Sequence, residues 1–223
     1  MKDLLKQYDI FIFDCDGVIL DVNNLKCEAF GRVVEGYPKK NIDDFVEHCR
    51  RTFGVSRYVK FKEFLSDFAN VPFEEKVYNG FLEKYASICN QIYRDAEITE
   101  GCISLFTELQ TLKKRLYIAS GSDEKELNQV FIDRNLSQYF QTIYGSPKTK
   151  LECIADILRN NLSKKAIFIG DAISDLESAE KYNIDFIYMA KYTVQSKKQD
   201  EICRKKAKMV INSLYDLTKT KGD

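Results

Sequence analysis

Short apolar runs alternate with amphipathic helical patterns through most of this 223-residue chain. Runs of three to six residues are typical of strands buried inside a parallel sheet. From residue 101 onward, stretches between them such as "CISLFTELQTL" and "LECIADIL" place their apolar residues on one face of a helix. Because strand and helix alternate, we expect an α/β fold whose core is a doubly wound parallel sheet with right-handed crossovers. The expected strands are residues 8–13, 115–120, 142–145, 166–170, 185–189 and 209–211.

The region 22–94 departs from this alternation. Its stretches "LKCEAFGRVVEG", "IDDFVEHCRRTF", "YVKFKEFLSDF" and "FEEKVYNGFLEKYASICNQIY" are amphipathic at helical spacing, without a convincing strand. Pro38 and Pro72 separate these helices, because a residue that precedes proline leaves the α region. We therefore expect residues 22–94 to form a helical domain inserted into a core made of residues 1–21 and 95–223.

Charge and composition narrow the class of partner. Lysine plus arginine and aspartate plus glutamate both number 34, so no field of one sign points to nucleic acid or an anionic membrane. The first ten residues lack the apolar run of a signal peptide, and no segment has the roughly 18 apolar residues of a membrane span. Seven scattered cysteines without a CxxC pair indicate reduced, buried thiols, and the single histidine, His48, argues against Ser-His-Asp or Cys-His catalysis. We expect a cytoplasmic protein that acts on a small molecule.

Carboxylates and small polar residues gather just beyond the expected strands. In an open parallel sheet, ligands bind outside the carboxyl ends of the strands, near the point where the strand order reverses. We therefore expect these residues to contribute to one site. They are Asp14 and Asp16 at the first strand, Ser120 and Gly121 at the second, and Asp171 and Asp175 after the fourth.

Helix capping is the alternative explanation for each of these residues, since Asp and Ser commonly cap helices. We expect that role for Ser122, which precedes the helical stretch "DEKEL". Capping does not account for the whole set, because each close pair of carboxylates repels by about 4 kcal/mol at roughly 4 Å and an effective dielectric near 20. The site therefore needs a cation, and an all-oxygen ligand set indicates Mg²⁺.

A phosphate group would account for the remaining polar residues. The Ser120 hydroxyl, the Gly121 N–H and a lysine from "GSPKTK" can hold phosphate oxygens. Beside Mg²⁺ and a phosphate, an aspartate without another partner can act as the nucleophile, because carboxylates form aspartyl-phosphate intermediates.

Four motifs stand in order, each after an expected strand: "DCDGVILD", "ASGS", a lysine further along, and "GDAISD". Together they resemble the signature motifs of the haloacid dehalogenase-like superfamily of phosphohydrolases. The helical insertion resembles the C1-type cap of its phosphoglycolate phosphatase and β-phosphoglucomutase-like members. The resemblance implies a Rossmann-like core, a Mg²⁺ cofactor, a small phosphorylated substrate and an aspartyl-phosphate mechanism.

Carried over by position, the resemblance also implies roles for single residues. It makes Asp14 the nucleophile, Asp16 the general acid and base, and Ser120 the hydroxyl that binds phosphate. The implied metal ligands are Asp14, Asp16 through its main-chain carbonyl, Asp171, and Asp175 through water while it also steadies the lysine.

Two lysines could complete the set. The family pattern of a lysine followed by an acidic and two apolar residues fits Lys150 in "KLECI". A second family pattern, in which proline follows the lysine, would select Lys148, but no proline stands there. We expect Lys150, with Lys148 as the alternative.

The loop "FGVSRYVKF" is the most informative part of the insertion. One interpretation has Arg57 and Lys60 as solvated residues at a helix start. The other has Arg57, together with Lys60, reaching over the closed site to an anionic or polyhydroxylated substrate, since guanidinium suits bidentate recognition of oxygens.

By resemblance, Asp16 indicates which reaction of the family this chain carries out. Phosphatases and phosphomutases keep this second aspartate, whereas dehalogenases and phosphonate-cleaving members lack it. We expect a Mg²⁺-dependent phosphatase acting on a sugar phosphate, a polyol phosphate or a similar metabolite. A β-phosphoglucomutase-like phosphotransferase is the alternative, and a catalytically silent binding protein is a third interpretation.

Overall fold

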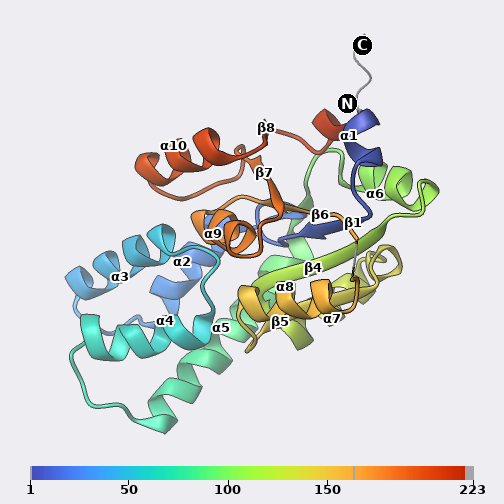
Figure 1. Ribbon diagram of the computed structural model, residues 1–223. Helices are drawn as coiled ribbons and strands as arrows, with labels where there is room; N and C mark the ends of the chain where they lie inside the picture. Colours follow the sequence, from blue (N-terminus) through green and yellow to red (C-terminus); the bar gives the residue numbers. More distant parts are fainter. Residues whose placement is uncertain (1, 163, 219–223) are drawn as a thin grey trace.

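A six-stranded sheet forms the centre of the computed structural model, which describes residues 2–162 and 164–218 (Figure 1). Its strand order is β5-β4-β1-β6-β7-β8, and every neighbouring pair is parallel. All expected strands are present, so the expected α/β class is confirmed; the second strand continues three residues beyond Ser120. The strands are β1 (Ile10–Phe13), β4 (Arg115–Asp123), β5 (Thr142–Ser146), β6 (Ala166–Gly170), β7 (Asp185–Met189) and β8 (Met209–Ile211).

Helices cover both faces of this sheet. Side chains of β1 alternate between the faces: Phe11 and Phe13 pack in one apolar cluster, and Ile10 and Ile12 in the other. The cluster with the phenylalanines includes residues of α1 (Lys2–Lys6), α6 (Cys102–Thr111), α7 (Glu124–Asp133) and α11 (Tyr215–Thr218). The cluster with the isoleucines includes residues of α8 (Lys150–Arg159), α9 (Ile173–Lys181) and α10 (Lys197–Lys206).

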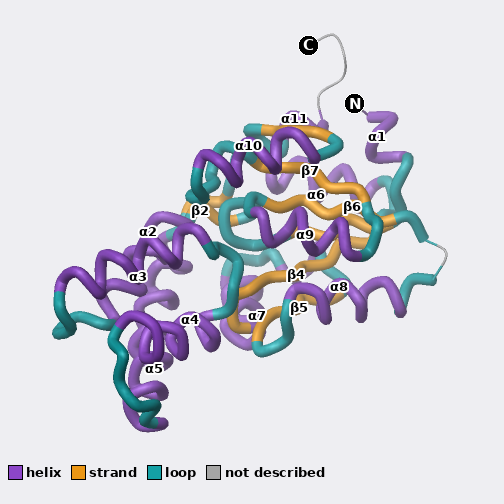
Figure 2. Tube along the Cα trace, turned by 60° about the vertical axis from the view of Figure 1, so that its left-hand side comes forward, coloured by secondary structure: helices purple, strands orange, loops and turns teal. Residues whose placement is uncertain are grey.

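Residues 23–95, here called the helical segment, fold beside the sheet rather than within its layers, at the lower left of Figure 1 and the left of Figure 2. The four expected helical stretches are confirmed. Their apolar faces meet in an aromatic core in which the Phe30 and Tyr85 rings stack with centroids 4.3 Å apart. The helices are α2 (Asn23–Val33), α3 (Lys39–Arg51), α4 (Arg57–Glu63), a π-helical turn (Phe64–Phe68) and α5 (Glu75–Asp95).

A short antiparallel ribbon joins the helical segment to the rest of the chain. It pairs β2 (Leu20–Asp21) with β3 (Glu97–Ile98), so that Leu20 faces Ile98 and Asp21 faces Glu97. The chain therefore leaves the sheet region and returns to it at one place.

Strand order reverses at β1, which lies between β4 and β6. The crevice beyond the carboxyl ends of these three strands is the expected ligand position in such a sheet. All seven cysteines are buried and free, as expected for thiols that fill the core. Among the described helices, none combines the length and apolar character needed to cross a membrane.

Candidate active site

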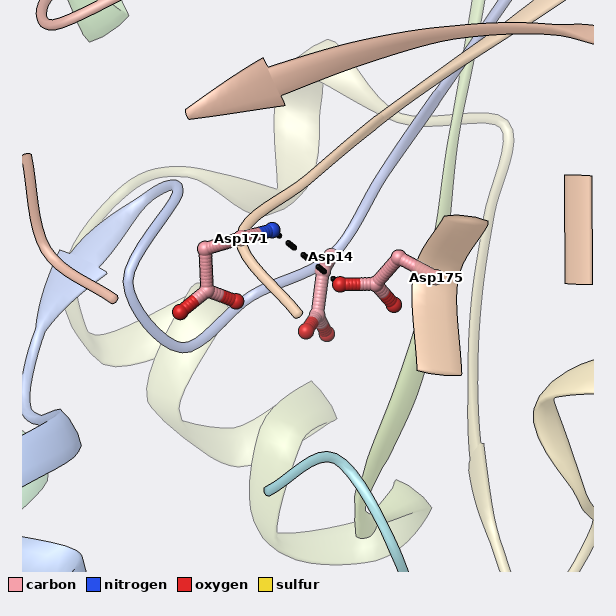
Figure 3. A group of neighbouring side chains, drawn as sticks. All are labelled: Asp14, Asp171 and Asp175. Carbon is pink, nitrogen blue, oxygen red and sulfur yellow. Dashed lines mark hydrogen bonds between the residues drawn. The ribbon is translucent and has the colours of Figure 1, made fainter. Parts of the chain in front are cut away.

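Three carboxylates meet beyond β1 and β6 (Figure 3). Asp14 follows β1, Asp171 follows β6, and Asp175 lies in the first turn of α9. One carboxylate oxygen from each lies within 4.8 Å of the others, and their residues are 2%, 1% and 0% exposed. The expected strand-end acids are thus brought together, apart from the side chain of Asp16.

Local structure fixes the position of each acid. The main-chain N–H groups of Asp171 and Ala172 each donate to Asp175 Oδ2 at 3.1 Å, so Asp175 caps the turn that carries Asp171. The Cys15 N–H donates to Asp14 Oδ1 at 2.7 Å. Gly17 has a φ of +75°, and a Cβ there would lie 2.5 Å from Asp171 Oδ2, so the turn after the first motif requires glycine.

The donor set fits a hard divalent cation. Burial raises the pKa of the Asp14 carboxyl to about 7, with Lys150 acting against the shift and Asp175 adding to it. The pKa of Asp171 is also raised, first by burial and then by the charges of Asp175 and Asp14. Asp171 Oδ1 is buried and has no hydrogen-bond partner within the described residues. These carboxylates offer only oxygen ligands, lack positive charge, and leave one oxygen without a partner. Mg²⁺ would supply the charge and the missing partner.

Lys150 supplies positive charge to this group. It is the first residue of α8, whose start is fixed by a capping box between Thr149 and Glu152. Its Nζ donates to Asp14 Oδ2 at 2.9 Å and also to Asp175 Oδ1. Lys148, the alternative, lies on the surface and pairs with Asp156 at 2.8 Å.

Asp16 has a separate set of partners. Its Oδ2 accepts from Lys26 Nζ at 2.5 Å and from Ser122 Oγ at 2.8 Å, and its Oδ1 accepts from the Tyr93 hydroxyl at 3.0 Å. Burial alone would raise the pKa of Asp16, but the Lys26 charge and these hydrogen bonds outweigh it and lower the pKa. The carboxyl is therefore held in its ionised form in this arrangement.

The capping role expected for Ser122 is wrong. Strand β4 continues to Asp123, and the Asp123 side chain caps α7 by accepting from the N–H groups of Lys125 and Glu126 at 3.0 and 3.1 Å. Carboxylate and hydroxyl both cap helices well, and the longer strand gives the position to the aspartate. The Ser122 hydroxyl is thereby free to bond Asp16.

Sequence reasoning missed three polar residues of the helical segment that reach the site. Lys26 and Tyr93 bond Asp16, and Asn23 Nδ2 donates to Asp171 Oδ2 at 2.6 Å. A usable signal existed for Lys26: it lies four residues before Phe30 and seven before Val33, on the apolar stripe of its helix. A lysine in such a stripe must be buried with a partner.

The loop before α4 rests on the core. Gly54 has a φ of +88°, and the Ser174 hydroxyl donates to the Phe53 carbonyl at 3.1 Å. A Cβ on Gly121 would lie 2.0 Å from the Gly54 carbonyl oxygen. The loop of the helical segment therefore packs directly on the β4 backbone, at a position where Gly121 has no side chain.

A small cavity of about 30 Å³ lies between the two parts, which is room for a few water molecules. Arg57 and Lys60 line it and are 4% and 1% exposed, so the interpretation that they are solvated is wrong. The sheet contributes Asp14, Asp16, Ser120, Gly121 and Ser122 to its lining. The helical segment contributes Lys26, Arg57 and Lys60, with the rings of Phe30, Phe53 and Tyr85.

Arg57 is bound to the core side of this cavity. Its two terminal nitrogens donate to the two carboxylate oxygens of Glu126 on α7, at 2.7 and 2.5 Å. The adjacent Tyr58 hydroxyl donates to Asp123 Oδ2 at 2.7 Å. These bonds join α4 to α7 across the gap between the helical segment and the core.

The parallel sheet carries buried carboxylates and a lysine at its switch point, where α/β folds bind their ligands. Residues 11–189 match the family model described as haloacid dehalogenase-like hydrolase, so the chain belongs to this family. The resemblance drawn from the four motifs is thereby confirmed.

Individual relatives agree with this assignment. The chain is 24% identical over 195 residues to a "Phosphorylated carbohydrates phosphatase" of Thermotoga maritima, covering 79% of this chain and 82% of that protein. A structure described as a "predicted phosphoglycolate phosphatase" from Haemophilus somnus matches with a TM-score of 0.74 at 12% identity, covering 95% and 97% of the two chains. The β-phosphoglucomutase of Clostridium difficile matches with a TM-score of 0.70 at 22% identity, covering 94% and 93%. The two structural matches establish the fold.

Proposed function

We propose that this protein is a Mg²⁺-dependent phosphatase that hydrolyses a small phosphorylated metabolite, such as a sugar or polyol phosphate, through an aspartyl-phosphate. The observation that carries the proposal is the buried group of Asp14, Asp171 and Asp175 with Lys150 bonded to two of them. Family membership and the name of the Thermotoga maritima relative support a phosphatase of phosphorylated carbohydrates.

The acidic group would hold the metal through Asp14 and Asp171, with the main-chain carbonyl of Asp16 as a further predicted ligand. Asp175 would stay hydrogen-bonded to the Asp171 turn and to Lys150, and would meet the metal through water. When bound, Mg²⁺ would draw negative charge from the transferred phosphoryl group.

In the proposed reaction, an Asp14 carboxylate oxygen attacks phosphorus in line, and the bond from phosphorus to the ester oxygen breaks. Asp16 gives a proton to the departing alkoxide. Water then attacks the phosphorus of the aspartyl-phosphate, its proton passes to Asp16, and inorganic phosphate leaves. Ser120, the Gly121 N–H and Lys150 would hold the phosphoryl oxygens.

Lys26 favours one of the two protonation states that Asp16 needs. The ion pair favours the ionised carboxyl, which is the form needed to accept a proton from water. The acid step needs the protonated form, which Lys26 opposes. Burial would lower the pKa of Lys26, but the charge of Asp16 outweighs it and raises the pKa, so the ammonium keeps its proton.

Residues 22–94, which hold nearly all of the helical segment, would act as the C1-type cap, and residues 1–21 and 95–223 as the core. A cavity of about 30 Å³ is far too small for a sugar phosphate, so the cap must move away from the core to admit substrate. Closure would then exclude water from the phosphoryl group.

A phosphate-release screen with Mg²⁺ over sugar, polyol, nucleotide and short-acid phosphates tests the proposal. Asp14→Asn should abolish turnover while its melting temperature shows a folded protein. Asp43→Asn, which changes an exposed carboxylate on α3, is the matched control and should keep full activity.

Three outcomes would change the conclusion. Interconversion of sugar phosphates with little free phosphate would indicate the phosphotransferase instead. Inertness towards the whole panel would support a binding protein. Substantial turnover by Asp14→Asn would remove Asp14 as the nucleophile.

A further inference from the structure

The helical segment brings three cationic side chains to the cavity beside Asp14: Lys26, Arg57 and Lys60. Two of them have a carboxylate partner. Lys26 pairs with Asp16 at 2.5 Å, and Arg57 makes its bidentate pair with Glu126. Their charges are therefore compensated before any substrate binds.

Lys60 differs from both. Within the described part of the chain no carboxylate oxygen lies within ion-pair distance of it, and its Nζ donates to the Cys49 carbonyl at 2.9 Å. The ammonium lies over the Phe30 ring, 4.9 Å from the centroid, and nearer to it than to the Phe53 ring. Lys60 is only 1% exposed, so water hardly reaches its ammonium group, and burial lowers its pKa.

An ammonium has three N–H donors, and the main-chain carbonyl uses one. Burying an unpaired charge is costly, and the two flanking rings recover only part of that cost. A lysine kept in this position at the wall of a substrate cavity is matched to an anion that arrives with the substrate.

We propose that Lys60 binds a second anionic group of the substrate, a carboxylate or a second phosphate on the leaving group. The proposal rests on the phosphatase function above and narrows its substrate class. It assigns anion recognition to Lys60, whereas Arg57 is engaged with Glu126 and joins the helical segment to the core.

Specificity follows from the dry surroundings of this ammonium. A neutral polyol tail would leave the buried charge unpaired, whereas an oxyanion would form a charge-assisted hydrogen bond away from water. A site that is built to pair a buried polar group rejects a substrate that lacks the partner.

Matched substrate pairs test the inference by their kcat/KM values. 3-Phosphoglycerate and glycerol 3-phosphate share a three-carbon skeleton and differ by a carboxylate. Fructose 1,6-bisphosphate and fructose 6-phosphate differ by a second phosphate. We expect the anionic member of at least one pair to be preferred, and the preferred pair identifies the kind of anion.

Lys60→Met keeps the aliphatic stem that packs between the rings and removes the charge. It should lower kcat/KM for the anionic member by about 10- to 100-fold, mainly through KM, with less than about a threefold change for the neutral member. Lys60→Arg, which keeps the charge, should retain the preference and serves as the test if the methionine variant does not fold. Lys62→Met removes an exposed lysine of the same helix and should change neither member.

The inference would be overturned if both members of each pair had equal kcat/KM values, or if Lys60→Met lowered kcat/KM equally for both members. Phosphate release in either case would leave the proposed function intact. Failure to hydrolyse any member, with p-nitrophenyl phosphate also inert, would overturn both.

Discussion

Asp171 shows how one residue can be built for a partner that the chain does not contain. One of its carboxylate oxygens accepts from Asn23, and the other is buried without a hydrogen-bond donor among the described residues. Its raised pKa means that the ionised carboxyl costs folding free energy in the metal-free protein. Under the proposed function, Mg²⁺ binding would recover this loss of stability.

Replacing Asp171 by asparagine should therefore separate stability from metal binding. The carbonyl oxygen of the new amide could still accept the hydrogen bond from Asn23, but the change would remove a buried negative charge from beside Asp14 and Asp175. With EDTA present, we expect Asp171→Asn to melt higher than the parent by about 2–4 °C for each kcal/mol of relieved repulsion.

Melting curves with and without millimolar MgCl₂ are the measurement. The parent should gain stability from the metal, whereas Asp171→Asn should gain little. Asp43→Asn should behave like the parent. A variant that melted lower than the parent in EDTA, or kept the full gain from Mg²⁺, would contradict this account.

At the scale of elements, α4 and α7 are joined by an ion pair that is shielded from water. The Arg57 and Glu126 side chains are 4% and 16% exposed, and the guanidinium also lies over the Tyr85 ring, 4.7 Å from its centroid. Both helices begin beside the cavity, so this pair links the wall of the cavity to the core.

Replacing only one partner of the ion pair should lower the free energy of unfolding more than replacing both partners. Glu126→Gln would leave a buried guanidinium without its anion, and we expect a loss of roughly 3 kcal/mol in the free energy of unfolding. The double variant Arg57→Met/Glu126→Gln should recover much of that loss, because no unpaired charge remains.

A double-mutant cycle by chemical denaturation measures the coupling. The exposed pair Lys39 and Asp43 on α3 is the matched control and should show a coupling of no more than about 1 kcal/mol. Additive losses at Arg57 and Glu126 would show that the pair does not hold the two elements together.

The sequence determined the strands and their polar ends well, because both depend on short-range patterns. A buried strand followed by Asp14 can be recognised within ten residues, and the family pattern in "KLECI" selects Lys150 from the sequence alone. The contacts that were missed depend on tertiary structure. Asn23 meets Asp171 across 148 positions of the chain, and no local pattern contains that pairing.

Lysine was the other source of error. The expectation that lysines lie in solvent is sound for most of the chain, yet Lys26 is buried against Asp16, and Lys60 is buried against the Cys49 carbonyl and the Phe30 ring. Ser122 was misassigned for a different reason, since the strand runs on for three residues and Asp123 takes the cap.

For the whole molecule, the arrangement is a closed one. The loop at Gly54 contacts Gly121 and Ser174, and the cavity beneath it has room for little more than water. Under the proposed function, substrate binding and product release would both involve movement of the helical segment.

Gly121→Val should prevent this closure without unfolding either part. Its Cβ would lie 2.0 Å from the Gly54 carbonyl oxygen, which is a position no real contact tolerates. We expect a large loss of kcat/KM, together with faster hydrogen exchange in residues 52–56 and a larger radius of gyration by small-angle scattering.

Gly80→Ala is the matched control, because a Cβ there meets nothing within 4 Å. That change lies inside α5 and should leave activity and hydrogen exchange in the loop unaffected. If Gly121→Val kept the parent's exchange rates and radius of gyration, the contact between the two glycines would not control closure.

The β2–β3 ribbon has a consequence for how such an enzyme can change over time. Because Asp21 and Glu97 are paired neighbours, everything between them begins and ends at a single junction. A different insert of similar span could be spliced in at that junction without altering the path of any strand or the spacing of Asp14, Lys150 and Asp171. The proposed nucleophile, lysine and metal ligand would thus be inherited unchanged, whereas the contacts that Lys26, Tyr93 and Asn23 make with Asp16 and Asp171 would change with the insert.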